Sequence, residues 1–306
     1  MAKNKKESGQ KPVGIVAKPS EEGVLILATK IIAWLKERDI ECFVDEEIFS
    51  DLKGQAQGHS KKLYRSQFTT ECDQVIVLGG DGTFISAARH PANTPSTIIG
   101  VNMGSLGFLT EIAQDEVFEI LESVLAEEAA LGERRLLKAR VFRKGKKLHT
   151  FFAMNDVVVT KETLARIFAI EVEVDKTAAA NLRGDGLICA TPCGSTAYSL
   201  AAGGSIVHPE VDALLLTPIC PHSLTSRPLV VPGSSTVRLG ISESNDINEP
   251  LYLTVDGQEG MELMPGDLIE VTTSDSAYRV ARSESRSYYD VLSEKLNWAS
   301  GGPRST

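Results

Sequence analysis

The stretch QVIVLGGDGT, residues 74–83, determines the fold of the first part of this chain. Its apolar half is short, rich in β-branched residues and bounded by turn residues, which is typical of a strand buried in a parallel sheet. The glycines that follow let backbone N–H groups approach a ligand closely, and ligands of open α/β sheets bind at the carboxyl ends of the strands. The stretch therefore predicts a ligand site at its glycine turn.

Asp81 is the acid of this turn. We expect Thr83 to be the N-cap of a helix that begins at Phe84. The dipole of that helix would favour a phosphate at its N-terminus. Asp81 would then lie beside the phosphate and could hold a metal ion or accept a proton. A generic glycine-rich turn with a capping aspartate is the alternative interpretation, and this stretch alone leaves it open.

The surrounding residues repeat the pattern of a strand followed by a helix. Further short strands are expected at residues 13–17, 41–44 and 97–101. Apolar residues on one helical face predict helices over residues 23–38 and 115–128, whereas the residues from 45 to about 64 are expected to form a polar loop. Alternating strands and helices predict an N-terminal α/β domain with a doubly wound parallel sheet.

The pattern changes near residue 130, where short alternating runs replace the helical intervals. Such runs predict an all-β C-terminal domain, either a sandwich or a closed sheet. The expected strands are residues 136–141, 148–152, 156–160, 168–174, 228–231, 236–239, 251–255 and 267–271. Helical spacing returns in residues 287–298, so we predict domains at 1–130 and 131–281, with residues 282–306 packing back on the first domain.

Composition excludes several classes of partner. The net charge is −9 and the sequence pI is about 5.2, which argues against a nucleic-acid or anionic-membrane surface as the main binding site. No apolar run is long enough to cross a bilayer. The five cysteines are scattered without a usual zinc spacing, so we expect reduced thiols, a cytoplasmic location and no dedicated protein metal site.

Three stretches together resemble one family. They are GGDGT at residues 79–83, MND at 154–156, and GDGL at 184–187 followed by TPCGSTAYS at 191–199. The chain resembles the NAD kinases, which phosphorylate the adenosine ribose 2′-hydroxyl of NAD to give NADP. The likeness extends from the first strand to Trp298 and includes VNMGSLGFLTE at 101–111, PHSLTSRP at 221–228 and VDGQ at 255–258.

The resemblance implies a role for each of these stretches. Asp81 is implied to be the general base or the residue that orients the metal, and a positioned carboxylate suits this role because a ribose hydroxyl is a poor nucleophile at neutral pH. Asn155 and Asp156 are implied to hold the ribose and adenine side, although an Asx turn is the alternative. Asp185 is implied to meet the nicotinamide amide. Two positions depart from the family pattern: Asp156 stands where Glu is commoner, and Cys193 stands where Thr is usual.

For each of the remaining implied contacts, the sequence also allows an ordinary structural interpretation. Arg166 could equally be a solvated surface charge, Tyr198 a packed core side chain, and Gln258 an ordinary turn residue. The residues that the resemblance implies for binding NAD and ATP are Gly80, Gly82, Thr83, Phe84, Asn155, Asp156, Arg166, Arg183, Asp185, Ser195, Thr196, Ala197, Tyr198, Ser199, Leu200, Ala201 and Gln258. The resemblance also implies Mg²⁺ or another divalent cation with ATP, and a homodimer or homotetramer with the β domains in contact.

Other functions are weighed against this one. The chain has no Walker motif and no protein-kinase motifs, which argues against those two classes of phosphoryl-transfer protein. It also has no G-x-G-x-x-G after the first strand, which argues against a dehydrogenase. A GGDGT kinase acting on a lipid or sphingoid alcohol should carry a basic or amphipathic membrane-facing segment, but the candidate segments here are acidic. A non-catalytic NAD(P)-binding sensor is the third hypothesis, and turnover of NAD with ATP would exclude it.

Overall fold

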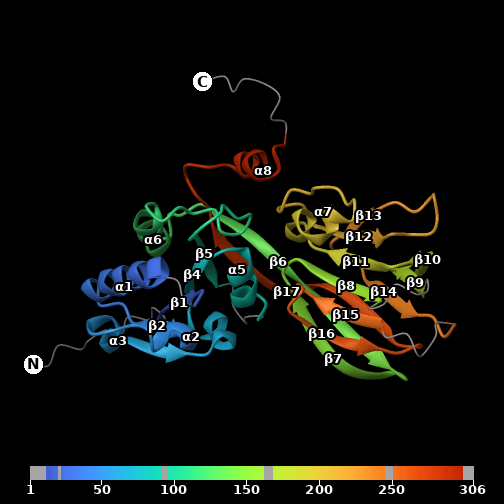
Figure 1. Cartoon of the computed structure of the whole chain (residues 1–306), viewed down its shortest axis with the longest axis horizontal. Coiled ribbons are helices and arrows are strands. Elements are labelled where there is room, and N and C mark those ends of the chain that lie inside the picture. Colours follow the sequence, from blue (N-terminus) through green and yellow to red (C-terminus); the bar gives the residue numbers. More distant parts are fainter. Residues whose placement is uncertain (1–11, 20–21, 91–95, 162–167, 245–250, 299–306) are drawn as a thin grey trace, which may run out of the picture. The chain divides into compact units, whose positions relative to one another are not determined.

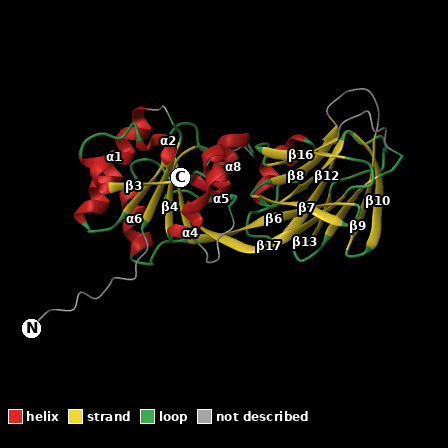
Figure 2. Ribbon diagram, turned by 90° about the horizontal axis from the view of Figure 1, so that it is seen from below, coloured by secondary structure: helices red, strands yellow, loops and turns green. Residues whose placement is uncertain are grey.

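The computed structural model describes residues 12–19, 22–90, 96–161, 168–244 and 251–298. These residues divide into two compact units: residues 1–132 with 278–306, and residues 133–277. The boundaries expected from the sequence were 130 and 281. Helices gather in the first unit, and the second consists almost entirely of strands (Figure 2). No helix in the described part of the chain is long and apolar enough to cross a membrane.

The first unit contains a parallel sheet with the strand order β5-β4-β1-β2-β3 (Figure 1). The strands are β1 (Val13–Ala17), β2 (Cys42–Asp45), β3 (Ser60–Leu63), β4 (Gln74–Gly79) and β5 (Thr97–Asn102). The end of a long strand, β17 (Leu268–Ala281), pairs in parallel with β5 through Arg279 and Val280. The predicted doubly wound α/β domain is confirmed.

Short helices fill the part of the first unit that was expected to be a loop. The helices of this unit are α1 (Glu22–Glu37), α2 (Glu46–Phe49), α3 (Gln55–His59), η1 (Arg65–Gln67), α4 (Phe68–Glu71), α5 (Asp81–Ala88), α6 (Val117–Leu125) and α8 (Tyr288–Leu296). The polar loop expected up to about Tyr64 is therefore wrong, because it contains α2, α3 and β3. These elements have four or five residues each, which is too short for periodicity to reveal them.

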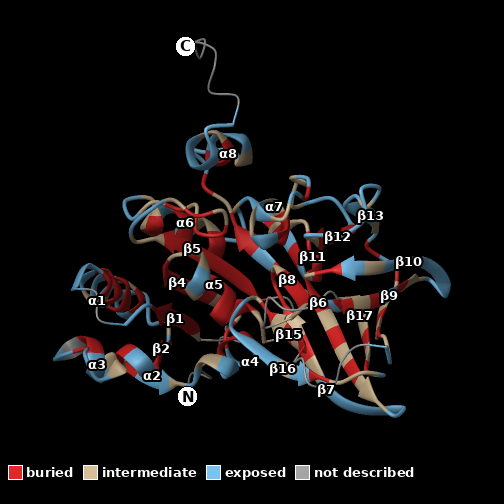
Figure 3. Ribbon diagram, turned by 45° about the vertical axis from the view of Figure 1, so that its right-hand side comes forward, coloured by how far each residue is buried: buried red, intermediate tan, exposed pale blue. Residues whose placement is uncertain are grey.

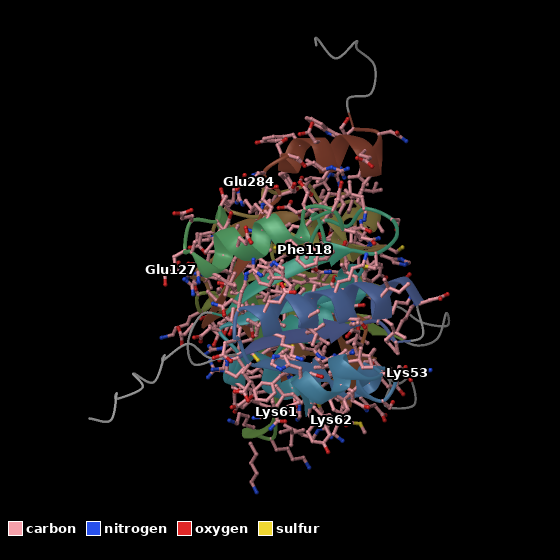
Figure 4. All side chains as sticks on the ribbon, turned by 90° about the vertical axis from the view of Figure 1, so that its left-hand side faces the viewer. Lys53, Lys61, Lys62, Phe118, Glu127 and Glu284 are labelled. Carbon is pink, nitrogen blue, oxygen red and sulfur yellow. The ribbon has the colours of Figure 1, made fainter. Side chains whose placement is uncertain are left out.

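Burial explains why the central strands are apolar throughout. Every residue of β1 is buried, as are five of the six residues of β4, because helices cover the sheet (Figure 3). On one side Trp34 of α1 meets Phe118 of α6, with ring centroids 6.1 Å apart. At the open edge, β3 carries Lys61 and Lys62, exposed charges that discourage pairing with a further strand (Figure 4).

The second unit is a sandwich of two sheets. One sheet contains β6 (Leu131–Arg143), β7 (Lys146–Ala153), β9 (Phe168–Val174), β10 (Thr177–Gly184), β14 (Val237–Ile241) and β17. The other has the order β13-β12-β11-β8-β15-β16 and is antiparallel: β8 (Asp156–Lys161), β11 (Gly186–Ala190), β12 (Ala213–Ile219), β13 (Leu229–Pro232), β15 (Leu251–Val255) and β16 (Glu259–Leu263). Alternate residues of both sheets form one core, so the predicted all-β domain is confirmed as a sandwich.

The second sheet is buried on both faces where it carries the sequence motifs. Val157 and Val159 of β8 face the sandwich core, whereas Val158 packs with Ile188 and Leu215 on the opposite face. The segment after β11 forms η2 (Cys193–Thr196) and α7 (Tyr198–Ala201). Continuous apolar runs such as LICA in β11 and ALLL in β12 follow from this double burial, and they concealed these two strands from an argument based on alternation.

Candidate functional site

The glycine turn after β4 leads directly into α5. This helix begins at Asp81, and Gly80 is its N-cap in an extended conformation. The expectation that Thr83 caps a helix from Phe84 is therefore wrong. Thr83 lies in the first turn, where a Cβ on Gly79 would come within 2.6 Å of its Oγ1, so a residue larger than glycine does not fit at position 79. Phe84 is fully buried, and its ring lies close to Gly100 of β5.

A loop after β5 surrounds the carboxylate of Asp81 with donors. Oδ1 accepts hydrogen bonds from Leu109 N at 2.9 Å, Thr110 N at 3.2 Å and Thr110 Oγ1 at 3.3 Å. Oδ2 accepts one from Phe108 N at 2.9 Å. A Cβ on Gly107 would overlap Asp81 Oδ1 and Thr110 Oγ1, so this loop can close around the carboxylate only because residue 107 is glycine. The carboxylate is thus fixed in one orientation, with Oδ2 as its less occupied oxygen.

The less occupied oxygen faces a basic side chain. Lys295 Nζ, on α8, lies 3.8 Å from Asp81 Oδ2 and 5.0 Å from the centre of the Phe108 ring. The side chains of Asp81 and Lys295 are 29% and 30% exposed, so solvent still reaches this oxygen. The sequence-based prediction missed Lys295, which no motif signals.

The described residues contain no group of three or more His, Cys, Asp or Glu side chains able to hold a metal ion. A nucleotide can nevertheless bring a divalent cation with it, because Mg²⁺ commonly keeps several waters and binds largely through substrate phosphates.

In the second unit, Asp256 organises the segment that precedes β8. Its Oδ1 accepts hydrogen bonds from Asn155 N at 2.8 Å and Asp156 N at 3.0 Å, and its Oδ2 accepts one from Met154 N at 2.8 Å. Asp256 lies in the left-handed region (φ 50°) of the turn that joins β15 to β16. The Asx turn, the alternative interpretation of Asn155 and Asp156, does not hold this segment, because the Asp256 carboxylate accepts its backbone N–H groups. The VDGQ stretch at residues 255–258 is the sequence signal for Asp256, although the resemblance pointed to Gln258 within it.

Asp156 is a buried carboxyl beside a second carboxylate. It is 5% exposed, and no described residue donates a hydrogen bond to its side chain. Burial, and then the neighbouring Asp256 carboxylate, raise the pKa of Asp156 from 3.8 to about 7. Near neutral pH, Asp156 is therefore protonated in part of the molecules and ionised in the others.

The loop after β11 packs against the same segment. Thr191 N donates to Asn155 O at 2.8 Å, and Thr191 Oγ1 donates to Met154 O at 2.6 Å. A Cβ on Gly194 would overlap the Asn155 carbonyl, so glycine is required at that position for the two segments to meet. The structure thus brings Asn155 and Asp156 together with the TPCGS loop.

Several hydroxyl groups of this loop are engaged within the protein. Ser195 Oγ donates to Pro192 O at 2.6 Å and accepts from Val207 N at 3.0 Å, and Ser199 Oγ bonds Thr217 Oγ1 at 2.8 Å. Both serines are fully buried, so their side chains hold the loop in place. Tyr198 is 46% exposed, which excludes the packed-core alternative and leaves its ring available to a ligand.

Asp185 lies between Gly184 and Gly186, and the backbone of neighbouring strands approaches both glycines closely. A Cβ on Gly184 would lie 2.9 Å from Ile219 O, and one on Gly186 would crowd Val159 O. The Asp185 carboxylate pairs with Lys161 Nζ at 2.9 Å, and this hydrogen bond is the main reason that the pKa of Asp185 lies below its ordinary value.

The remaining predicted residues occupy varied positions. Gly80, Gly82 and Thr83 lie at the start of α5 beside Asp81. Thr196 Oγ1 bonds Cys193 O, Ala197 is the N-cap of α7, and Leu200 and Ala201 belong to that short helix. Arg183 and Gln258 are exposed. Arg166 lies outside the described residues.

Comparisons with known proteins converge on one family. The family model described as ATP-NAD kinase N-terminal domain matches residues 13–129, and the model for the ATP-NAD kinase C-terminal domain matches residues 154–283. The curated NAD kinases of Syntrophotalea carbinolica and Geobacter sulfurreducens are each 42% identical over 288 residues, covering 94% of this chain and 99% of theirs.

Solved structures agree in fold. The yeast NADH kinase complexed with NADH has a TM-score of 0.86 and 27% identity, over 98% of this chain and 91% of that one. An NAD kinase from Archaeoglobus fulgidus in complex with ATP has a TM-score of 0.69 at 21% identity, over 92% and 99% of the two chains, and shows likeness of fold alone.

Proposed function

The chain belongs to the NAD kinase family and is an NAD kinase, and we propose that Asp81 is the base of its phosphoryl transfer. The observation that supports this role is the fixed orientation of Asp81, whose Oδ2 keeps capacity for a further hydrogen bond. A base that must accept a hydroxyl proton needs such an oriented, partly free oxygen within reach of its substrate.

The proposed step conserves atoms and charge. The 2′-oxygen of the adenosine ribose of NAD bonds to the γ-phosphorus of ATP, and the bond from that phosphorus to the β–γ bridging oxygen breaks. The proton of the 2′-hydroxyl passes to Asp81 Oδ2, and ADP and NADP leave. Phosphoryl transfer depends mainly on positioning and on neutralising charge, which suits a site whose one fixed acid lies at the start of a helix.

The second unit supplies the proposed contacts to NAD. Asn155 and Asp156 offer an amide and a carboxyl to the ribose hydroxyls, from a backbone that Asp256 holds in place. Tyr198 offers an exposed ring for an aromatic base, and Asp185 offers a carboxylate to the nicotinamide amide. Because the side chains of Ser195 and Ser199 are engaged internally, we assign their contribution to the shape of the loop.

Three further features belong to the same proposal. A divalent cation would arrive with ATP, held by the phosphate oxygens, where it would neutralise phosphate charge. The protein would act in the cytoplasm, where its five free cysteines remain reduced. It would assemble as a homodimer or homotetramer through the β units.

Replacing Asp81 by asparagine tests the assignment of the base. We expect NADP formation from NAD, ATP and Mg²⁺ to fall by at least about a hundredfold in Asp81→Asn, the lower range for a positioned base. Asp115→Asn, at an exposed position of the same unit, serves as the matched control and should retain the wild-type rate. Nearly full activity in well-folded Asp81→Asn would move the base to another residue.

A further inference from the structure

The C-terminal helix α8 is tied to the first unit by its connecting segment. Arg282 N donates to Ala130 O at 3.0 Å, and Ser283 N donates to Glu111 Oε1 at 3.2 Å. The Ser283 hydroxyl donates to Glu116 Oε1 at 2.9 Å. A capping box between Ser287 and Asp290 then starts the helix. The position of α8 on this unit is thus set by hydrogen bonds that begin before its first turn.

One face of α8 lies against the loop that holds Asp81. Tyr288 and Lys295 are seven positions apart, which places them two turns apart on the same face. The ring centroid of Tyr288 is 6.4 Å from that of Phe108, and Lys295 Nζ lies 5.0 Å from the centre of the Phe108 ring. Val291 and Leu292, between them in the sequence, are buried. Phe108 is therefore covered by the same helical face that points an ammonium group at Asp81.

Lys295 and Phe108 meet at the same oxygen of Asp81. Phe108 N donates to Oδ2 at 2.9 Å, and Lys295 Nζ lies 3.8 Å from Oδ2. No other Lys or Arg among the described residues pairs with the Asp81 carboxylate. We propose that Lys295 is a positioning residue of the phosphoryl transfer, which acts through Asp81 by balancing its charge and holding Oδ2 toward the substrate.

The physical reason is the charge that gathers at this turn during the reaction. ATP brings several negative charges to the glycine turn that carries the Asp81 carboxylate, and like charges at close range repel. An ammonium group beside Oδ2 offsets part of that repulsion. Contact with the Phe108 ring keeps the ammonium near the carboxylate by a cation–π interaction.

This inference rests on the proposed role of Asp81, and one set of variants tests both. Lys295→Met removes the charge but keeps an unbranched apolar side chain over Phe108, and Lys295→Arg restores the charge. Glu294→Gln is the matched control, because it removes a charge from the same helix. The Glu294 carboxylate pairs with Arg286 at 3.9 Å. For each variant, kcat, the KM values for NAD and ATP, and the melting temperature are measured beside wild type and Asp81→Asn.

We expect kcat of Lys295→Met to fall about tenfold or more, with KM for NAD within twofold of wild type and an unchanged melting temperature. Lys295→Arg should recover most of the rate, and Glu294→Gln should match wild type. A purely structural role would not give this separation of kcat from KM together with rescue by arginine.

Three results would overturn the inference. They are wild-type kcat in Lys295→Met, a higher kcat (which would make the contact inhibitory), or an equal loss in Glu294→Gln. If Lys295→Met is fully active while Asp81→Asn is inactive, the inference fails and the role of Asp81 stands. If Asp81→Asn itself is active, the proposed base fails.

Discussion

Asp81 in the first unit and Asp156 in the second lie in opposite surroundings, although the family resemblance implies a substrate role for both. Four donors from residues 108–110 surround the Asp81 carboxylate, and a lysine faces its Oδ2. Asp156 is buried without a described donor to its side chain and lies near the Asp256 carboxylate. The same side chain thus accepts hydrogen bonds from a surrounding loop in one unit and is a readily protonated acid in the other. Only their surroundings differ.

Replacing Gly107 is expected to disturb the surroundings of Asp81 most strongly. An alanine there would overlap Asp81 Oδ1 and Thr110 Oγ1, so the loop or the carboxylate must move. A displacement of about 1 Å at a reacting group can cost about a hundredfold in rate. We therefore expect kcat of Gly107→Ala to fall by about that factor. Gly104→Ala, in the same loop, meets no atom within 4 Å and should keep wild-type kcat. Equal rates in the two variants would show that the cradle is not needed.

In the second unit, Asp256 is the corresponding support. Asp256→Asn leaves one acceptor oxygen for the backbone N–H groups of residues 154–156 and removes the charge that they bind. We expect the free energy of unfolding to fall by about 2 kcal/mol, within the range for lost hydrogen bonds to a charged group. KM for NAD should rise while kcat changes less.

Denaturant unfolding and steady-state kinetics measure both effects of Asp256→Asn. Asp275→Asn, an exposed aspartate of the same unit, is the control and should change neither quantity. A rise in KM for NAD in Asp256→Asn without any loss of stability would mean that Asp256 contacts the substrate rather than the backbone.

Asp156 adds a pH dependence to the free energy of unfolding. Its pKa is about 7 in the folded protein against 3.8 unfolded, so between these values the folded state binds more protons than the unfolded state. Its contribution to stability is therefore complete below pH 4 and is lost as pH rises toward 7. One proton limits the slope to about 1.4 kcal/mol per pH unit.

Unfolding free energies of wild type and Asp156→Asn between pH 4.5 and pH 8 isolate this contribution. We expect the difference between the two proteins to shift in favour of the variant as pH rises, since asparagine does not titrate. A constant difference across that range would show that Asp156 titrates in the folded state as it does in the unfolded chain.

Much of the fold followed from local patterns in the chain. The strands 168–174 and 251–255 were predicted with the bounds that β9 and β15 have, because alternating residues face one core and one outer surface. The elements that escaped prediction had either too few residues, as α2 and α3 do, or no alternation, as in β11 and β12, whose two faces are both buried. The N-cap of α5 was misplaced because the glycine, rather than the threonine, adopts the extended conformation.

The sequence by itself determined the glycine turn with Asp81, the parallel and antiparallel halves of the fold, and membership of the NAD kinase family, because each is expressed in residues close together in the chain. Only the tertiary structure decided what surrounds each acid. The donors to Asp81 lie 27 to 29 positions away, and Asp256 lies 100 positions from Asp156. Hydrogen bonding, burial and pairing of charges depend on distance in space, which the order of residues does not contain.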